Sequence, residues 1–159
     1  MSLDHDTFFM KMALKQAMLA FDNGEVPIGA VIVHDNEVIA SDYNRVEKLV
    51  DPTAHAEILV LRRASESISN WRLRGMSLYV TLEPCPMCMG AILLARISRL
   101  VWASFDPRMG GNGLSVGLAR DCSWATLPDM RGGVLRNESL QLIQTFFSLQ
   151  RNKKDNSSP

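Results

Sequence analysis

Residues 78–88 have the sequence LYVTLEPCPMC, in which an apolar run leads directly into a turn that carries two cysteines. The run at 78–82 contains the aromatic and β-branched residues that strands prefer. Pro86 suits the first position of a helix, because the N–H group that proline lacks has no partner there. We therefore predict a strand at 78–82 and a helix over 86–96, with both cysteines at the helix entry.

A second stretch, DPTAHAE at residues 51–57, has the same character. Its opening Asp-Pro pair is typical of a helix start, and we predict a helix over residues 54–67. In the middle of a helix, residues two apart point about 200° away from each other, so His55 and Glu57 could not serve one atom there. In the first turn their side chains can reach past the helix end, and we expect both to lie there.

The two stretches together contain the ligand set of a metal site. Cys85 and Cys88 are three residues apart, which places them on one face of a helix. Two helix N-termini aimed at one point favour thiolates over thiols. One histidine and two cysteines, with water as the fourth ligand, form an accepted catalytic zinc arrangement. The sequence therefore predicts one zinc ion per chain, bound by His55, Cys85 and Cys88.

Glu57 is not needed as a ligand, which leaves its carboxylate available for proton transfer. Zinc lowers the pKa of a bound water molecule from about 15.7 to about 7. A carboxylate beside that water can accept its proton and pass protons to a ring nitrogen and a leaving amine. This chemistry suits an aminopyrimidine or aminopurine, which would give a carbonyl and ammonia. We therefore predict a hydrolytic deaminase with Glu57 as the catalytic residue.

The cysteine motif also has simpler interpretations. A single Cys-x-x-Cys is often a redox pair or half of a structural zinc site. A closed structural site would need a fourth protein ligand, for which the chain offers His5, His34 or Cys122. None of the three has an ordered spacing to the other ligands. The joint pattern, with each half at a predicted helix entry, favours the catalytic zinc.

The part of the chain before the first motif predicts a helix and a hairpin. Asp6 is a candidate N-cap for a helix over residues 7–22, which show helical periodicity. Two β-type runs follow at 28–33 and 37–43, with a turn at Asp35-Asn36 between them. Runs this close together are typical of an antiparallel hairpin.

Strands and helices alternate from residue 55 onward, which indicates parallel pairing and an α/β layered domain. The remaining predicted elements are a strand at 98–103, a short helix near 115–121, a short strand near 133–136 and a helix over 137–151. We predict a single domain over residues 1–151 and a polar, frayed tail over 152–159.

Composition points to a globular protein of the cytoplasm. Of the 159 residues, 47% are hydrophobic and 21% charged, and no apolar run reaches the roughly 18 residues that a membrane span requires. The acidic N-terminus is not followed by an export signal. Three cysteines, two of them at ligand spacing, fit a reducing compartment better than a disulfide framework. We therefore predict a cytoplasmic protein.

The balanced net charge hides an asymmetry along the chain. Residues 1–60 contain four Lys/Arg and ten Asp/Glu, whereas residues 61–159 contain thirteen and seven. If several of these basic residues share one face, they could follow the phosphates of a nucleic acid. Alternatively, they are scattered, solvated charges.

The paired motifs are the signature by which zinc-dependent nucleobase deaminases, bacterial tRNA adenosine deaminases included, are described. The chain resembles the tRNA-specific adenosine deaminase family, within the cytidine/deoxycytidylate deaminase superfamily. The resemblance is carried by EVPIGAV at 25–31, DPTAHAE at 51–57, LYVTLEPCPMC at 78–88 and the continuation GAI…ARI at 90–97. It implies a three-layer α/β/α fold with a five-stranded mixed sheet, a homodimer, and conversion of the wobble adenosine of a tRNA anticodon to inosine.

The resemblance also implies roles for residues outside the two motifs. Asn44 would hydrogen-bond the flipped base, and Pro27 and Ile28 would line its pocket. Asp106 would contact the sugar of a neighbouring nucleotide, and Phe147 or its neighbour would wedge against the RNA. Each of these residues also has an ordinary role, as a turn residue or as part of the core.

The chain departs from the family pattern between residues 105 and 136. Phe105 stands where a basic or polar residue is usual, and the expected Asn-His pair is absent. Two alternatives therefore stay open. One is a deaminase of free guanine, cytosine or cytidine, and the other is a zinc-stabilised binding module without activity.

Overall fold

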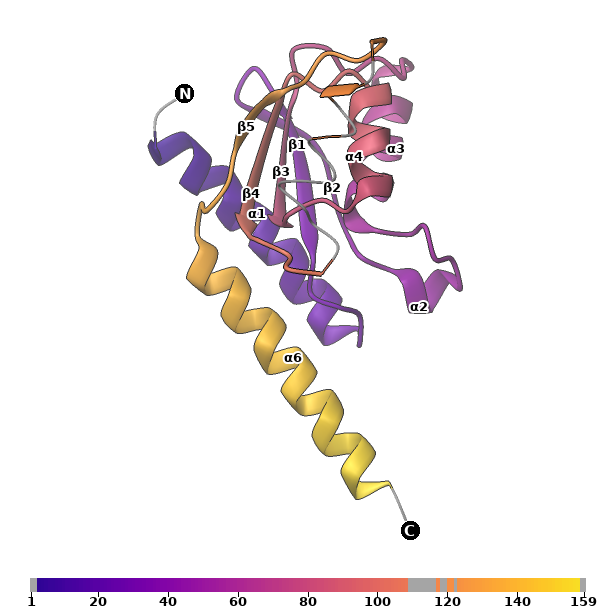
Figure 1. Cartoon of the computed structure of the whole chain (residues 1–159), viewed down its shortest axis with the longest axis vertical. Helices are drawn as coiled ribbons and strands as arrows, with labels where there is room; N and C mark the ends of the chain where they lie inside the picture. The colour runs from indigo at the N-terminus through magenta and orange to yellow at the C-terminus, as the bar shows by residue number, and fades with distance from the viewer. Residues whose placement is uncertain (1–2, 109–116, 118–119, 122, 158–159) are drawn as a thin grey trace.

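The computed structural model describes residues 3–108, 117, 120–121 and 123–157. Five strands form one mixed sheet in the order β2-β1-β3-β4-β5 (Figure 1). The strands are β1 (Gly29–His34), β2 (Glu37–Tyr43), β3 (Ser77–Leu82), β4 (Arg99–Ser104) and β5 (Asp129–Arg131). The helices are α1 (Leu3–Asp22), α2 (Val46–Leu49), α3 (Ala56–Ile68), α4 (Pro86–Leu94) and α6 (Arg136–Asn156).

The sheet combines a hairpin with a parallel half. Strands β1 and β2 pair antiparallel through a turn in which Asp35 and Asn36 both have positive φ, as two-residue hairpins require. Strand β1 also pairs antiparallel with β3, whereas β3, β4 and β5 pair parallel. Because β3 and β4 run in the same direction, the segments that follow them leave from one edge of the sheet, where α/β proteins place their sites.

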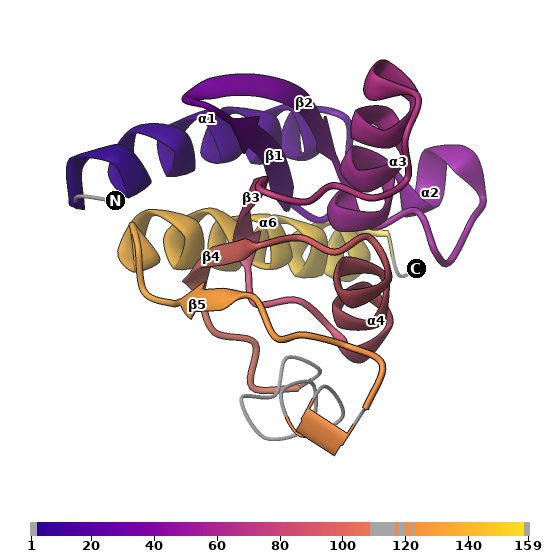
Figure 2. The same cartoon turned by 90° about the horizontal axis from the view of Figure 1, so that it is seen from above.

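Helices cover both faces of this sheet. In Figures 1 and 2, α1 and α6 lie on one face, and α3 and α4 lie on the other. Alternating strand residues divide between the two layers, because successive side chains point to opposite faces. Val31, Tyr79 and Val101 pack with α1, whereas Ile32 and Val80 pack with α3 and α4. The predicted three-layer α/β/α architecture is therefore confirmed.

The sequence located most elements to within two residues. The confirmed elements are the hairpin strands at 28–33 and 37–43, the strands at 78–82 and 98–103, and the helices at 54–67 and 86–96. The strand predicted near 133–136 is wrong, because β5 lies at Asp129–Arg131. The short helix predicted near 115–121 falls mostly outside the described residues.

No helix in the described ranges is long and apolar enough to cross a bilayer.

Both ends of the chain differ from the prediction. Helix α6 continues to Asn156 instead of ending at residue 151, so most of the predicted tail is helical. Its polar last turn carries Lys153 and Lys154, whose charges interact favourably with the helix dipole. Helix α1 begins at Leu3, so Asp6 lies inside the helix and is not its N-cap.

Asp6 instead forms a buried ion cluster. Its side chain is fully buried and accepts hydrogen bonds from Arg99 at 2.6 and 3.0 Å, from Arg131 at 2.6 Å and from the Tyr79 hydroxyl at 3.0 Å. Burial alone would raise the pKa of Asp6, but the hydrogen bonds from Arg99, Tyr79 and Arg131 lower it overall. The cluster joins α1 to β3, β4 and β5.

We expect Asp6→Asn to lower the free energy of unfolding by about 2–3 kcal/mol, because it weakens the charge-assisted hydrogen bonds that Arg99 and Arg131, both partly buried, donate to the Asp6 carboxylate. The folded pKa of Asp6 lies below the ordinary 3.8, so its stabilising contribution is present above that value and is lost as the pH falls through the folded pKa. Urea unfolding of both proteins at several pH values measures this contribution to the free energy of unfolding. The exposed Asp22→Asn of the same helix is the control, and an equal loss at pH 3 and pH 7 would contradict the role of the Asp6 charge.

Candidate active site

Two helix entries bring the candidate metal ligands together. His55 is the N-cap of α3 and Cys85 is the N-cap of α4, and both have extended backbone angles. Neither side chain caps its own helix, so both can point past the helix end. Cys88 lies in the first turn of α4 and is fully buried. This is the local geometry that the two motifs predict.

The three ligand atoms converge on one point. Nδ1 of His55 lies 3.6 Å from Sγ of Cys85 and 3.5 Å from Sγ of Cys88, and all three atoms lie within 4.8 Å of one another. A tetrahedral zinc with Zn–N about 2.05 Å and Zn–S about 2.3 Å separates nitrogen from sulfur by about 3.6 Å. The described residues therefore form a cluster that could hold a metal ion, with zinc-like spacing.

The three ligand groups shift one another's pKa values. A hydrogen bond from the Cys88 thiol lowers the pKa of Cys85 to about 4. The same hydrogen bond, together with burial, raises the pKa of Cys88. The hydrogen bond to Cys85 raises the pKa of His55. A divalent cation between the three groups would stabilise both thiolates and neutral imidazole, because these are the forms that bind zinc.

Glu57 lies in the first turn of α3 and is only 4% exposed. Burial raises the pKa of its carboxyl group to about 7. Its carboxylate also interacts with the Cys88 thiol, which places it beside the ligand cluster. A carboxyl group with a pKa near neutrality can both accept and donate a proton in the working pH range.

Two of the alternative ligands, His5 and His34, lie outside this cluster. The ring of His5, on α1, makes an edge contact with the ring of Phe9. At the hairpin turn, Nε2 of His34 lies 3.8 Å from Oδ2 of Asp35. Cys122 falls outside the described residues. Within the described part of the chain, the group of possible ligands at this site consists of His55, Cys85 and Cys88.

A cavity of about 670 Å³ opens onto the cluster. His55, Cys85 and Glu57 line it. Four of the residues singled out by resemblance line it as well: Ile28, Asn44, Asp106 and Phe147. Pro27 is buried and is not among the described residues that line the cavity. The structure therefore brings the predicted site residues together around one cavity, except for Pro27, which is buried and does not line it.

Asn44 and Asp106 are held in place by polar contacts. Asn44 is 6% exposed, and its side-chain amide donates to the carbonyl of Val26 at 3.4 Å. The N–H of Asp106 donates to the Glu83 carboxylate at 3.2 Å. Asp106 in turn accepts a hydrogen bond from the N–H of Arg108 at 2.9 Å. Asp106 is thus linked to Glu83 of the metal-ligand motif.

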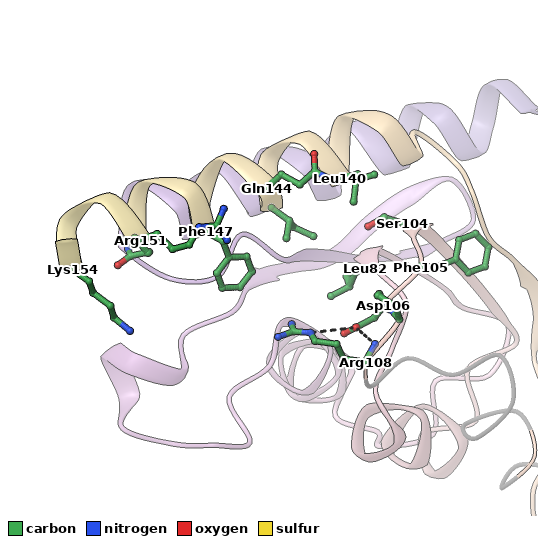
Figure 3. A pocket seen from close by; sticks show the side chains of 13 residues that line it. Leu82, Ser104, Phe105, Asp106, Arg108, Leu140, Gln144, Phe147, Arg151 and Lys154 are labelled. Carbon is green, nitrogen blue, oxygen red and sulfur yellow. Dashed lines mark hydrogen bonds and ion pairs between the residues drawn. The ribbon is translucent and has the colours of Figure 1, made fainter.

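Helix α6 supplies the other side of the cavity. Phe146 is buried and packs against Phe21, whereas the neighbouring Phe147 lines the cavity. A second cavity of about 520 Å³ lies between α6 and the segment after β4. Figure 3 shows it from close by, with Phe147, Arg151 and Lys154 on α6 and Arg108 below.

The two cavities are adjacent. They share part of their lining: Leu82, Asp106, Arg108, Ile143, Phe147, Gln150 and Lys154. The second cavity therefore extends the first along α6, with an apolar floor and basic residues around it.

Several lining residues were not found by the sequence analysis. Glu25, Glu83, Arg108 and Lys154 all line the main cavity. Glu25 and Glu83 lie within the quoted stretches 25–31 and 78–88, and that position was the available signal. Arg108 and Lys154 belong to the basic part of the chain, but nothing in their spacing separates them from other exposed basic residues.

Comparison with known proteins gives consistent results. The family model of the MafB19-like deaminases matches residues 3–120. A tRNA-specific adenosine deaminase of Bacillus subtilis is 41% identical over 96% of this chain and 94% of its own length. The chloroplastic tRNA(adenine(34)) deaminase of Arabidopsis thaliana is 44% identical over 91% of this chain, which spans 12% of that longer protein.

A solved structure from work on A-to-I editing by tRNA:A34 deaminases is also similar to this chain. It is 46% identical and has a TM-score of 0.81, covering 86% of this chain and 99% of its own. The agreement extends from sequence to fold over almost the whole domain.

Proposed function

Since the chain belongs to the family of tRNA-specific adenosine deaminases, we propose that it converts the wobble adenosine of a tRNA anticodon to inosine by hydrolysis. The observation that carries this proposal is the convergence of His55, Cys85 and Cys88 on one point, with Glu57 beside them. The reaction releases ammonia and leaves a carbonyl at C6 of the purine.

The ligand set supports zinc as the metal. One imidazole nitrogen and two thiolates at tetrahedral spacing match its preference. A zinc ion bound there supplies activation of a water molecule as the nucleophile. His55, Cys85 and Cys88 would hold the ion, and the first turns of α3 and α4 fix their positions.

Glu57 is the proton carrier in this proposal. Its buried carboxylate accepts a proton from the attacking water and donates it to the ring nitrogen. It then accepts the remaining proton of the hydroxyl group added to C6 and passes it to the leaving amine, so that ammonia leaves and a carbonyl forms. Burial keeps bulk water from competing for these protons. The pKa near 7 supports a group that changes protonation state within each cycle.

The remaining predicted residues would bind the substrate. The Asn44 amide would hydrogen-bond the target base, and Ile28 would contact its face. Pro27, buried directly before Ile28, would fix the backbone of that wall rather than touch the base. Asp106 would accept a hydrogen bond from the sugar of a neighbouring nucleotide, and Phe147 would pack against the RNA.

The cavity along α6 supports an RNA substrate over a free base. Arg108, Arg151 and Lys154 surround it, and Arg108 lies 5.9 Å from the centroid of the Phe147 ring. Basic groups beside an aromatic ring suit a phosphate chain with unstacked bases. Such a substrate, together with the reduced cysteines, is consistent with the cytoplasm as the compartment.

The zinc-loaded protein should produce inosine at the wobble position of an adenosine-34 tRNA, read by sequencing the anticodon. KM for an anticodon stem-loop should rise steeply with salt, because phosphate contacts release counterions. A stem-loop with guanosine at the same position is the control. Ammonia release from free guanine, cytosine or cytidine, unaffected by salt and without inosine in tRNA, would favour the alternative deaminase.

We also propose that two copies associate through the outer face of α3 and α4. Trp71 and Leu94 are 53% and 58% exposed there, and both line a groove with Ile58, Leu61 and Ala91. An exposed apolar groove of this kind marks an interaction surface. The resemblance that predicts a homodimer supports a second copy as its occupant.

Leu94→Lys should convert the dimer into a monomer, because it places an unpaired charge in the centre of the apolar contact. Sedimentation velocity resolves the two species. Met18→Lys, which changes a residue 56% exposed on α1, should leave the dimer intact. A wild-type protein that sediments as a monomer at micromolar concentration would overturn this proposal.

A further inference from the structure

Residues 44–55 form a loop that joins two residues of the active site, Asn44 and His55. The loop contains α2, a single helical turn in which no residue is buried. At its tip, Leu49 and Val50 are 47% and 90% exposed. Hydrophobic packing therefore does not hold α2 in place, and its position depends on polar contacts.

The two ends of the loop are tied together. The N–H of Asn44 donates to the carbonyl of Ile28 at 3.0 Å, and the N–H of Arg45 donates to the carbonyl of Ala54 at 3.0 Å. The Arg45 side chain also pairs with the buried carboxylate of Asp42. These contacts fix the base of the loop and leave α2 itself to be held by another group.

Glu25 is that group. One oxygen of its carboxylate accepts the N–H of Lys48 at 2.8 Å, and the other accepts the N–H of Glu47 at 3.2 Å. Arg45, the residue before α2, makes no capping hydrogen bond with its side chain, so Glu25 satisfies these donors from a distant part of the chain. Glu25 is itself fixed, because its N–H donates to the carbonyl of Ala20 at the end of α1.

Glu25 is 1% exposed, and no described Lys, Arg or His forms a salt bridge with it. A buried carboxylate is costly unless hydrogen bonds compensate for the lost hydration. The two backbone N–H groups supply that compensation, and bonds to a charged acceptor are stronger than neutral ones. Both oxygens are therefore directed at α2.

The same carboxylate lines the active-site cavity beside Val46 and Glu47 of α2. The geometry points to Glu25 as a positioning residue, which holds α2 as a wall of the cavity against which the RNA strand beside the reacting nucleotide is bound. This inference rests on the proposed function for its substrate. It assigns to Glu25 a role in binding the polynucleotide and none in the chemical step.

The test compares Glu25→Ala and Glu25→Gln in the full, zinc-loaded chain with an anticodon stem-loop. KM should rise about tenfold in Glu25→Ala, because charge-assisted hydrogen bonds are lost, while kcat stays within about threefold. Glu25→Gln keeps one carbonyl acceptor in the same shape and should show a smaller rise. Glu37→Ala, which removes an exposed glutamate of β2, is the control and should match wild type.

Amide hydrogen exchange of the free protein, followed by NMR, tests the anchoring itself. Exchange at Glu47 and Lys48 should accelerate in the order wild type, Glu25→Gln, Glu25→Ala. Unchanged exchange at these two amides, or a fall in kcat with KM unchanged, would overturn the assignment. Exchange is measured without RNA, so an inactive wild-type enzyme would refute the proposed function while the exchange rates still decide the role of Glu25.

Discussion

Glu57→Gln should lower the rate of deamination by about 10²–10⁴-fold, the range that a positioned general acid–base group contributes. Glutamine has nearly the same shape as glutamate, but its amide cannot accept and return a proton. Glu57 is buried beside the ligand cluster and is not one of its three ligands. We therefore expect zinc content, measured by mass spectrometry of the dialysed protein, to stay at one ion per chain.

The control for this variant is Glu138→Gln, which changes an exposed glutamate in the first turn of α6. It should match wild type in rate and in zinc content. Single-turnover kinetics with the stem-loop isolates the chemical step from product release. Wild-type turnover by a correctly folded Glu57→Gln protein would remove Glu57 from the mechanism and require another proton carrier in the cavity.

Cys88→Ala should abolish both zinc binding and activity. Cys88 is fully buried between the other two ligands and Glu57, so water cannot replace its sulfur without disturbing the packing around it. Removing one of three protein ligands leaves too few to retain the ion through dialysis. Turnover should fall below detection, since activation of the attacking water is lost with the metal.

The melting temperature of Cys88→Ala should also stop responding to added zinc, because a ligand stabilises only the state that binds it. Cys122→Ser is the chemical control, and it should keep one zinc per chain. Full zinc content in Cys88→Ala, or its loss in Cys122→Ser, would show that the ligand set is different from the one inferred here. A chelator followed by zinc should remove and restore wild-type activity.

The candidate metal ligands could be located from the sequence because their geometry is local. His55 and Cys85 are each placed by the start of one helix, and helix starts have recognisable signals such as Pro86. The apolar runs likewise identify β1, β3 and β4. Because successive side chains of these runs are apolar, both faces of each strand are expected to be covered by helices. This is enough to predict that the two motifs meet at one edge of the sheet.

The elements that were missed are held by distant partners. Strand β5 is three residues long and polar, with the sequence Asp-Met-Arg, and exists because it pairs with β4. Helix α2 has no buried residue and depends on Glu25, more than twenty residues away. Asp6 lies in the first turn of α1 and not at its N-cap, and its side chain is held by Arg99 and Arg131. No local pattern contains these partners.

The direction of α6 decides where a fusion partner can be attached. Gln150 and Lys154, near the end of this helix, line the active-site cavity, whereas α1 begins at the opposite end of the molecule (Figure 1). An affinity tag after residue 159 would lie close to the opening of this cavity. A tag before residue 1 would stay clear of it. Protein for enzymatic assays is therefore best purified with an amino-terminal tag.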